Sequence, residues 1–552
     1  MNRLIRLNRV SDKHMAKKYC IAAVFLLAGL GFNVSAQDSP QTNTGESPLF
    51  RGEQLLMTGS YAAATDIFQM ADGLDRNEGL VGASKAFAMM GNYQEAMSIV
   101  EAAIEDDDYA RFPLLSTQLA EIKRAVGESQ EALRILEVVV LDLADPPVRT
   151  LVQYGSLLDF VGQKQLAVSI LDQAVQRYNN GLVFASEDVG MVALASWLMG
   201  NFHDANSLFS EATRANPNNL EAHTLWGDLF LEKYNASDAE RSYQEALDVN
   251  GRYVPALVGI ANVVGDERAL QRALAINPNS IPAMETYGQL LMLNGREDEA
   301  MDYFERVLAL NPESLKTLSV LASKAALEER SDEYADYLAQ VEAFSPNNPI
   351  FLGNVADTFG NNYLFDEAVE FARAAIAADS QYWQGYTLLG SNLIRLGEEE
   401  EGKANLEIGY ENDPFNVMTS NMLKVFDTLE TYTTQESAHF KVHMSQNDAD
   451  ILWPYLEPLL EEGWDTLTAK YGFEPEGPIL IEVFEKSEDF AVRSVGLPDI
   501  GPLVGICFGK VITLISPDTL SANWQEIVWH EFMHVITLQM TGNRMPRWLS
   551  EG

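Results

Sequence analysis

Cysteine is nearly absent from this chain. Only Cys20 and Cys507 occur in 552 residues, and Cys20 lies in an N-terminal segment that the sequence predicts to be removed. One remaining cysteine excludes an intrachain disulfide, and with it the class of small domains held together by disulfides. Stability must therefore come from packing or from a metal ion.

The chain is too long for one ordinary domain, so we expect several domains or a repeat array.

Basic residues are also scarce. The chain has 38 Lys and Arg against 80 Asp and Glu, which gives a formal net charge of -42. Such an acidic surface repels nucleic acid and anionic lipid, and it favours basic or neutral polypeptides as partners. Hydrophobic residues nevertheless make up 47% of the chain. That content excludes a largely disordered protein.

An uninterrupted apolar run occurs near the start of the chain, where YCIAAVFLLAGLGF follows a basic stretch. The run is short for a membrane span. It is followed by Val34-Ser35-Ala36, a site typical of signal-peptide cleavage. We therefore predict a signal peptide at residues 1–36, a linker at 37–46 and export of the mature chain. An uncleaved N-terminal anchor is the alternative.

A short landmark recurs through the middle of the chain, as in ANPNN, INPNS and LNPES. Its aligned position falls at Asn216, Asn250, Asn277, Asn311, Ser345, Asp379 and Asp413. The spacing is 34 residues at every step except the second, where it is 27. A sustained period of 34 indicates paired helices that stack into a solenoid. The segment 251–277 lacks seven residues, so we expect one short or kinked pair there.

The residues within each period fit the same interpretation. In residues 281–312, Gly288 allows two helices to approach closely, Gly295 ends the first helix, and Ala300 and Phe304 begin the packed face of the second. The segment from 47 to 430 resembles the tetratricopeptide repeat family, with about ten helical pairs. This resemblance implies a superhelix whose concave side binds an extended peptide or a protein partner. An architectural spacer is the alternative.

The pattern changes near residue 435. We expect a strand in TYTTQESAHFKVHMS, a long helix in DADILWPYLEPLLEEGWDTLTAKYG and a strand at 477–485. A short helix in SEDFAVRSVG, a strand or tight hairpin at 505–516, a helix at about 520–540 and a helix opened by Pro546 follow. This order predicts a small α+β domain. We interpret His439 and His443 as ordinary strand residues, and the Glu398–Glu401 run as a solvated helix turn.

The segment WHEFMHVITLQM carries the residues with the clearest chemistry. On a helix, His530 and His534 lie one turn apart on one face, a spacing that allows two imidazoles to bind one zinc ion. Glu531 is offset by one residue and can reach a metal-bound water. An open catalytic zinc site needs a third protein ligand, and Glu551 on the next helix is the candidate. Two surface histidines on an amphipathic helix are the alternative.

HEFMH followed by PRWLSEG resembles the glutamate-zincins. More closely, residues 435–552 resemble the peptidase-MA-like domain found beside tetratricopeptide arrays in bacterial exported proteins. The resemblance implies that His530, His534 and Glu551 bind Zn2+, and that Glu531 is the general base. It also implies that GICFGKVITLIS is an edge strand that pairs with the substrate backbone. We interpret Cys507 in that strand as a packing residue rather than a nucleophile.

The sequence therefore predicts an α-helical solenoid, a tetratricopeptide superhelix, followed by a small α+β zincin-like domain. The expected function is that of a periplasmic zinc metallopeptidase whose array recruits a polypeptide. The alternative is a non-catalytic adaptor of the cell envelope with a vestigial or truncated peptidase domain. The resemblance implies further helices past Gly552, so we expect the metallopeptidase domain to be C-terminally incomplete.

Overall fold

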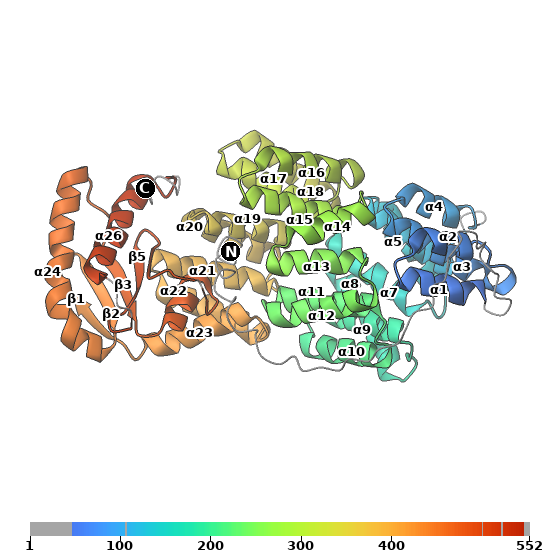
Figure 1. The fold of residues 1–552 in the computed structure, drawn as a ribbon, viewed down its shortest axis with the longest axis horizontal. Helices are drawn as coiled ribbons and strands as arrows, with labels where there is room; N and C mark the ends of the chain where they lie inside the picture. Colours follow the sequence, from blue (N-terminus) through green and yellow to red (C-terminus); the bar gives the residue numbers. More distant parts are fainter. Residues whose placement is uncertain (1–46, 105–107, 500, 520–522, 546–552) are drawn as a thin grey trace, which may run out of the picture.

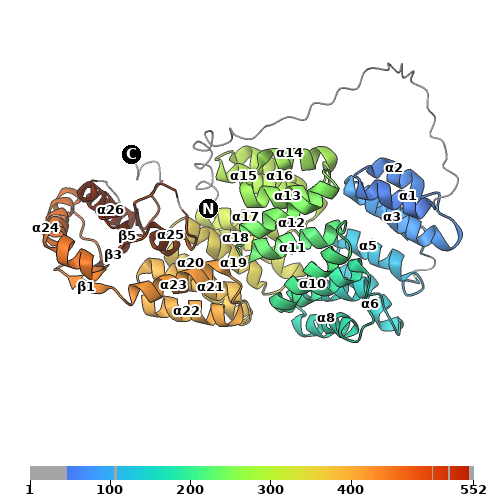
Figure 2. The same cartoon turned by 60° about the horizontal axis from the view of Figure 1, so that its bottom comes forward.

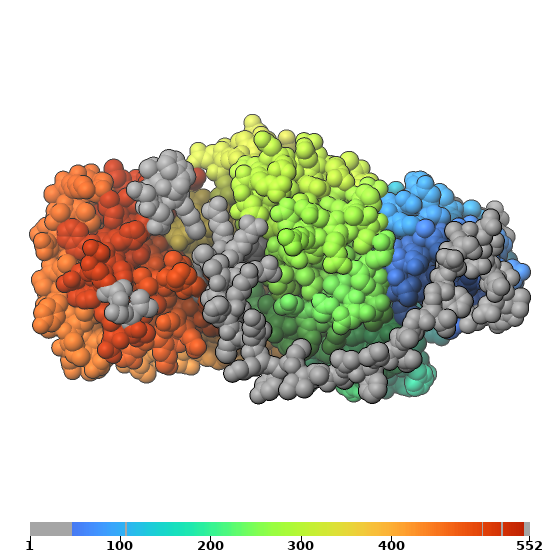
Figure 3. Space-filling model, viewed as in Figure 1, coloured from blue at the N-terminus to red at the C-terminus, as the bar shows by residue number. Residues whose placement is uncertain are grey.

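The computed structural model describes residues 47–104, 108–499, 501–519 and 523–545. The predicted signal peptide and linker, the helix expected from Pro546 and Glu551 lie outside these residues. A long helical array occupies the N-terminal part, and a domain with one sheet forms the other end of the molecule (Figures 1 and 3). Within the part that the structure describes, no helix is both long and apolar enough to cross a membrane.

The array begins with helices that stack in antiparallel pairs (Figure 2). Their bounds are α1 (Pro48–Met57), α2 (Tyr61–Phe68), the 3-10 helix η2 (Gly73–Asp75), α3 (Arg76–Met89), α4 (Tyr93–Glu101), α5 (Pro113–Ala125), α6 (Ser129–Asp142), α7 (Val148–Phe160), α8 (Lys164–Asn179), α9 (Ser186–Leu198), α10 (Phe202–Ala215), α11 (Leu220–Glu232) and α12 (Ala236–Val249). The array continues with α13 (Val254–Val264), α14 (Glu267–Ile276), α15 (Ile281–Leu293), α16 (Glu297–Leu310), α17 (Leu315–Leu327), α18 (Ser331–Phe344), α19 (Pro349–Asn361), α20 (Phe365–Ala378), α21 (Trp383–Leu396), α22 (Glu399–Asn412) and α23 (Val417–Leu429).

These helices form eleven pairs and the single helix α23 among the described residues, close to the predicted ten pairs. Small residues set the distance between paired helices. A Cβ atom at Gly288 of α15 would lie 2.5 Å from the Phe304 ring of α16, and one at Gly227 of α11 would lie 2.5 Å from the Tyr243 ring of α12. The aromatic side chain of the second helix therefore fits against the bare backbone of the first, as the repeat pattern predicts.

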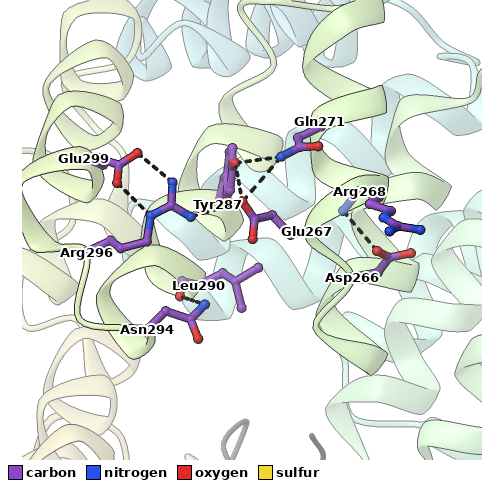
Figure 4. A network of polar contacts seen from close by, with 9 residues as sticks. All are labelled: Asp266, Glu267, Arg268, Gln271, Tyr287, Leu290, Asn294, Arg296 and Glu299. Carbon is purple, nitrogen blue, oxygen red and sulfur yellow. Dashed lines mark hydrogen bonds and ion pairs between the residues drawn. The ribbon is translucent and has the colours of Figure 1, made fainter. Parts of the chain in front are cut away.

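The pair α13–α14 is shorter than its neighbours, which confirms the expectation from the missing residues. The two helices have 11 and 10 residues, against 13 and 14 in α15 and α16. Glu267 at the start of α14 joins the short pair to the next one: its Oε1 accepts hydrogen bonds from Tyr287 and Arg296 (Figure 4). Arg296 also contacts Glu299, so a polar network offsets the lost helical length.

The array winds back onto itself. Residues 180 to 215 positions apart hydrogen-bond to one another, most of them 185 to 189 positions apart, so the chain completes a superhelical turn over about that distance. We name these contacts the inter-turn seam. On one side are the helix turns at residues 59–61, 88–93, 125–129, 160–164 and 233. On the other side are landmark positions of the repeat, Asn250, Asn277, Asn311, Ser345, Asp379 and Asp413.

The C-terminal domain contains one five-stranded sheet. Its elements are β1 (Thr433–Glu436), β2 (Phe440–Met444), α24 (Gln446–Tyr471), β3 (Ile479–Phe484), α25 (Ser487–Val495), β4 (Gly505–Cys507), β5 (Val511–Ile515) and α26 (Trp524–Met540). The strand order is β1-β2-β3-β5-β4; β2, β3 and β5 are parallel, and each outer strand is antiparallel to its neighbour. The predicted long helix, the short helix, the helix that ends at Met540 and the hairpin at Gly509-Lys510 are confirmed, whereas the helix expected from Pro546 lies outside the described residues.

One strand prediction is wrong. The alternating segment near residue 435 forms two strands, because a turn at residues 437–439 separates β1 from β2. Glu461 of α24 fixes this turn by accepting hydrogen bonds from Ser437 Oγ and His439 N. The His439 ring stacks on Trp464 with 4.0 Å between centroids, so His439 is a turn residue and not a strand residue. These contacts come from a later helix, so the local alternation contains no sign of them.

Both faces of the sheet are buried. Alternate residues of the central strands, such as Val442, Ile481 and Ile512, pack against α24 and α26. The residues between them, Leu480, Phe484, Val511 and Ile515, pack against α25 and against array helices. The array therefore forms the second layer over the sheet, and the two parts of the molecule share a hydrophobic core.

Candidate metal centre

Helix α26 carries the H-E-x-x-H motif and lies along the face of the sheet opposite the array. Val528, Phe532, Val535 and Ile536 point into the core shared with α24 and the strands. The Phe532 ring packs edge-on against Phe440 and stacks on Trp464. Because this apolar stripe fixes the rotation of the helix, the histidine face is directed away from the core.

His530 and His534 converge as the spacing predicts. Their Nε2 atoms lie 3.0 Å apart, and the two rings are nearly perpendicular. Two nitrogen ligands of a tetrahedral zinc ion lie about 3.3 Å apart, given bond lengths of about 2.0 Å. The arrangement therefore fits a shared metal ion with little movement. His530 is exposed, whereas His534 is buried, so the site opens to solvent on one side.

Glu531 lies between the two histidines in sequence and is directed at strand β4. Its side chain is 6% exposed. A Cβ atom at Gly505 would lie 2.6 Å from Glu531 Oε1, so only glycine at this position leaves room for the carboxylate. The backbone of β4 and the general-base candidate are therefore in direct proximity.

Cys507 on the same strand is a packing residue in the structure. Its side chain is buried, and the Gly509 amide donates to its Sγ at 3.3 Å. Burial raises the pKa of the Cys507 thiol far above its usual range, and the negative charge of Glu531 raises it further. A thiol held in its neutral form is a poor nucleophile, in agreement with the prediction.

A cavity of about 900 Å³ lies over the motif. One wall consists of α26 and β4. The other comes from the array, at Leu327, the last residue of α17, and at Tyr363 and Leu364 between α19 and α20. Arg544, just past α26, forms ion pairs with Glu329 and Glu367 of the array at 3.2 Å each. The array therefore completes the cavity. The sequence contains no signal for these wall residues, because they are ordinary positions in helix turns.

The third predicted metal ligand, Glu551, lies outside the described residues. The backbone path toward it is defined as far as Met545. Gln539 anchors the end of α26 by bonding to the Glu476 backbone and to Gly509 O. The two histidines and Glu531 are thus placed together, and Glu551 as a ligand stays a prediction.

Comparison with known proteins identifies the array. Residues 193–256 and 281–314 match the tetratricopeptide repeat family. The array is built of tetratricopeptide repeats. Such repeats typically form protein-interaction scaffolds, so the matched repeats favour a role in binding protein partners.

The other comparisons add little to this assignment. No curated protein matches the chain. Among solved structures, the crystal structure of the yeast Tom70 is similar at 16% sequence identity and a TM-score of 0.31. The similarity covers 69% of this chain and 88% of that chain.

Proposed function

We propose that this protein is an exported, periplasmic zinc metallopeptidase, and that its tetratricopeptide array recruits the polypeptide to be cleaved. One observation carries the proposal. The two histidines of α26 converge on one point, with Glu531 beside them, in a large cavity. This combination of two metal ligands, a carboxylate and a substrate-sized space is what hydrolysis at an open zinc site requires.

The proposed site residues have two roles, metal binding and proton transfer. His530, His534 and Glu551 would hold the metal ion. When bound, zinc polarises a scissile carbonyl and lowers the pKa of a water molecule. Glu531 accepts the proton of the attacking water at its carboxylate and later transfers that proton to the leaving amine nitrogen. Its buried position beside Gly505 keeps the carboxylate in place for both transfers.

Strand β4 provides the binding surface for the substrate backbone. It is an edge strand of the sheet and pairs on one side with β5. The cavity lies along β4, next to the histidines. An extended polypeptide could add to this edge as a further strand, with backbone hydrogen bonds giving affinity. The substrate class is therefore an extended or locally unfolded polypeptide.

Glu531→Gln tests the proposal most directly. The variant keeps the shape and the metal ligands but cannot accept a proton. We expect proteolysis of an unfolded casein probe to decrease about 10²- to 10⁴-fold, with the zinc content unchanged. His534→Ala should lose proteolysis and the zinc ion held at this centre. Zinc is measured by elemental mass spectrometry and proteolysis by release of labelled peptides.

Glu488→Gln is the matched control. Glu488 is exposed on α25, outside the cavity. This variant should retain zinc and full activity. Two results contradict the peptidase proposal: a folded protein that binds no zinc, or a Glu531→Gln variant that cleaves casein as fast as the unmodified chain.

The second candidate function is that of a non-catalytic adaptor. The tetratricopeptide repeats favour it, because they account for protein binding without any chemistry. For an adaptor, Glu531→Gln leaves the cellular role unchanged, whereas truncation of the array abolishes it. For a peptidase, Glu531→Gln alone abolishes the cellular role while partners still bind.

A further inference from the structure

A second group of metal-ligating side chains lies between the array and the sheet. His443 of β2 and Glu482 of β3 are direct neighbours in the register of these parallel strands. Glu399, at the start of α22, approaches them from the array. One ligand atom from each residue lies within 4.8 Å of the other two. The sequence interpretation of the Glu398–Glu401 run as solvated is therefore wrong for Glu399, which is half-buried.

The cluster has too little positive charge. Glu482 is 0% exposed, and Arg493 of α25 forms an ion pair with its Oε2 at 2.8 Å. Neither Glu482 oxygen accepts a hydrogen bond of normal geometry from the described residues. Arg493 also donates to Ile394 O of the array. Arg493 pairs with Glu482, and Glu399 lies against the same carboxylate, so two carboxylates in a poorly solvated site repel each other unless a cation lies between them.

A second cation must therefore share the space between the carboxylates, and it is either a proton or a metal ion. Lys441 lies on the same face of β2, but among the described residues it forms no ion pair with the cluster.

We propose that Glu399, His443 and Glu482 bind a second divalent metal ion, which joins the tetratricopeptide array to the C-terminal domain. One imidazole and two carboxylates form a mixed nitrogen and oxygen donor set, which suits Zn2+ and related transition metals better than Ca2+ or Mg2+. Metal bonds of about 2.0–2.2 Å require the three ligand atoms to approach one another by roughly 1 Å. Arg493 remains on Oε2 and orients the ligating carboxylate.

The three ligands come from three elements, and one of these elements belongs to the array. A metal ion at this position would therefore stabilise the interface between α22 and the sheet. Its role is structural, because the surrounding interface is apolar and the ligands are buried or half-buried. The site is independent of the peptidase proposal, since α26 covers the opposite face of the sheet.

The test removes the first candidate centre and asks whether zinc still binds. The full chain is prepared as His530→Ala/His534→Ala, stripped with chelator and equilibrated with Zn2+. We expect about one zinc per chain by elemental mass spectrometry, and a zinc-dependent rise in the unfolding temperature. Adding Glu399→Gln or His443→Ala to this background should abolish both signals. Near-UV circular dichroism checks that each variant is folded.

Matched controls separate this site from chance binding. Glu400→Gln and His203→Ala change exposed residues of the same types, and both should leave the zinc content unchanged. Zinc absent from the folded double variant overturns the proposal, as does zinc that survives Glu399→Gln. Stability that depends on pH but not on zinc shows that a proton fills the space, which also overturns it. Loss of one zinc ion from His534→Ala tests the peptidase proposal only, and it leaves the proposal of a second site unaffected.

Discussion

Two interfaces join parts of this chain that are far apart in sequence, and they are built differently. The interface between the sheet and the array is largely apolar. Phe484 and Ile515 pack with Phe426 of the array, and Val511 packs with Phe365. The inter-turn seam combines polar and apolar contacts: Phe160 stacks on Phe344, and Ile276 packs against the core of α2 and α3. There, Asn279 Nδ2 donates to Gly91 O, and Asn250 Nδ2 donates to Tyr61 Oη.

The difference has consequences for how the molecule can move. Apolar area removed from water contributes about 25 cal/mol per Å², so the sheet and the array should separate only on unfolding. A hydrogen bond between partners that water can replace contributes about 1 kcal/mol. Each polar bond of the inter-turn seam, such as that from Asn279 to Gly91, therefore contributes less than a buried apolar side chain of the sheet interface. The cavity over the H-E-x-x-H motif belongs to the sheet interface, because the array provides one of its walls there.

The largest expected effect comes from Phe484→Ala. Phe484 is fully buried on the array side of the sheet. Loss of the ring should lower the free energy of unfolding by about 3–5 kcal/mol. Because the array shares this core, amide exchange should increase in α21, α22 and α23 as well as in the sheet. Hydrogen exchange with mass spectrometry measures this distribution.

Phe532→Ala is the matched control for the opposite face. It should cost a similar free energy, but the faster exchange should appear in α24 and α26, which pack around Phe532. If Phe484→Ala leaves the amide exchange of α21–α23 unchanged, the array and the sheet do not share a cooperative hydrophobic core.

A smaller effect concerns the buried charge at the sheet interface. In the metal-free protein, Glu482 is protonated up to about pH 7 when folded but ionises near pH 4.5 when unfolded. The folded state therefore binds more protons between these values, and stability should decrease by up to about 3 kcal/mol as pH rises through this window. Glu482→Gln should remove this slope, although the unpaired Arg493 lowers its stability at every pH. Urea unfolding at pH 5 and pH 8, with chelator present, measures the slope.

The same unfolding experiment, repeated with Zn2+, tests whether the metal ion binds Glu482. A bound divalent ion replaces the shared proton and keeps Glu482 ionised, so saturating Zn2+ should flatten the pH dependence of the unmodified chain. A slope of the same size with and without Zn2+ would mean that the ion does not reach Glu482.

Local patterns predicted the elements of this protein well. The 34-residue period identified the paired helices, and the missing seven residues located the short pair α13–α14. The spacing of His530 and His534 predicted their convergence, since both lie on one helix whose rotation follows from its apolar stripe. In each case the relevant contacts lie within a few turns of the chain.

Contacts between distant segments could not be predicted. The turn that splits β1 from β2 depends on Glu461, which lies more than 20 residues later. Glu399 seemed to belong to a solvated run, because nothing near it in sequence indicates that the sheet covers it. The landmark asparagines were correctly seen as repeat positions, but their contacts with turns of the previous superhelical turn depend on how the whole array winds.

The smallest expected effect concerns the inter-turn seam, and Gly91→Ala tests it. Gly91 has φ +80, and a Cβ atom there would overlap Asn277 Oδ1. The left-handed backbone costs alanine about 1 kcal/mol. Displacing Asn277 also weakens its bonds to Asn279 N and Ala88 O, which adds roughly 1 kcal/mol.

Gly200→Ala isolates the seam contribution. Gly200 has φ +79, but no described atom lies within 4 Å of the position that its Cβ would take, so only the backbone cost applies. The difference between the two variants in urea unfolding should be about 1 kcal/mol, and amide exchange near α3 and α15 should increase only for Gly91→Ala. Equal losses in both variants would mean that the contact between Gly91 and Asn277 contributes nothing. The apolar contacts across the seam, such as Phe160 on Phe344, would then account for the pairing of the two superhelical turns.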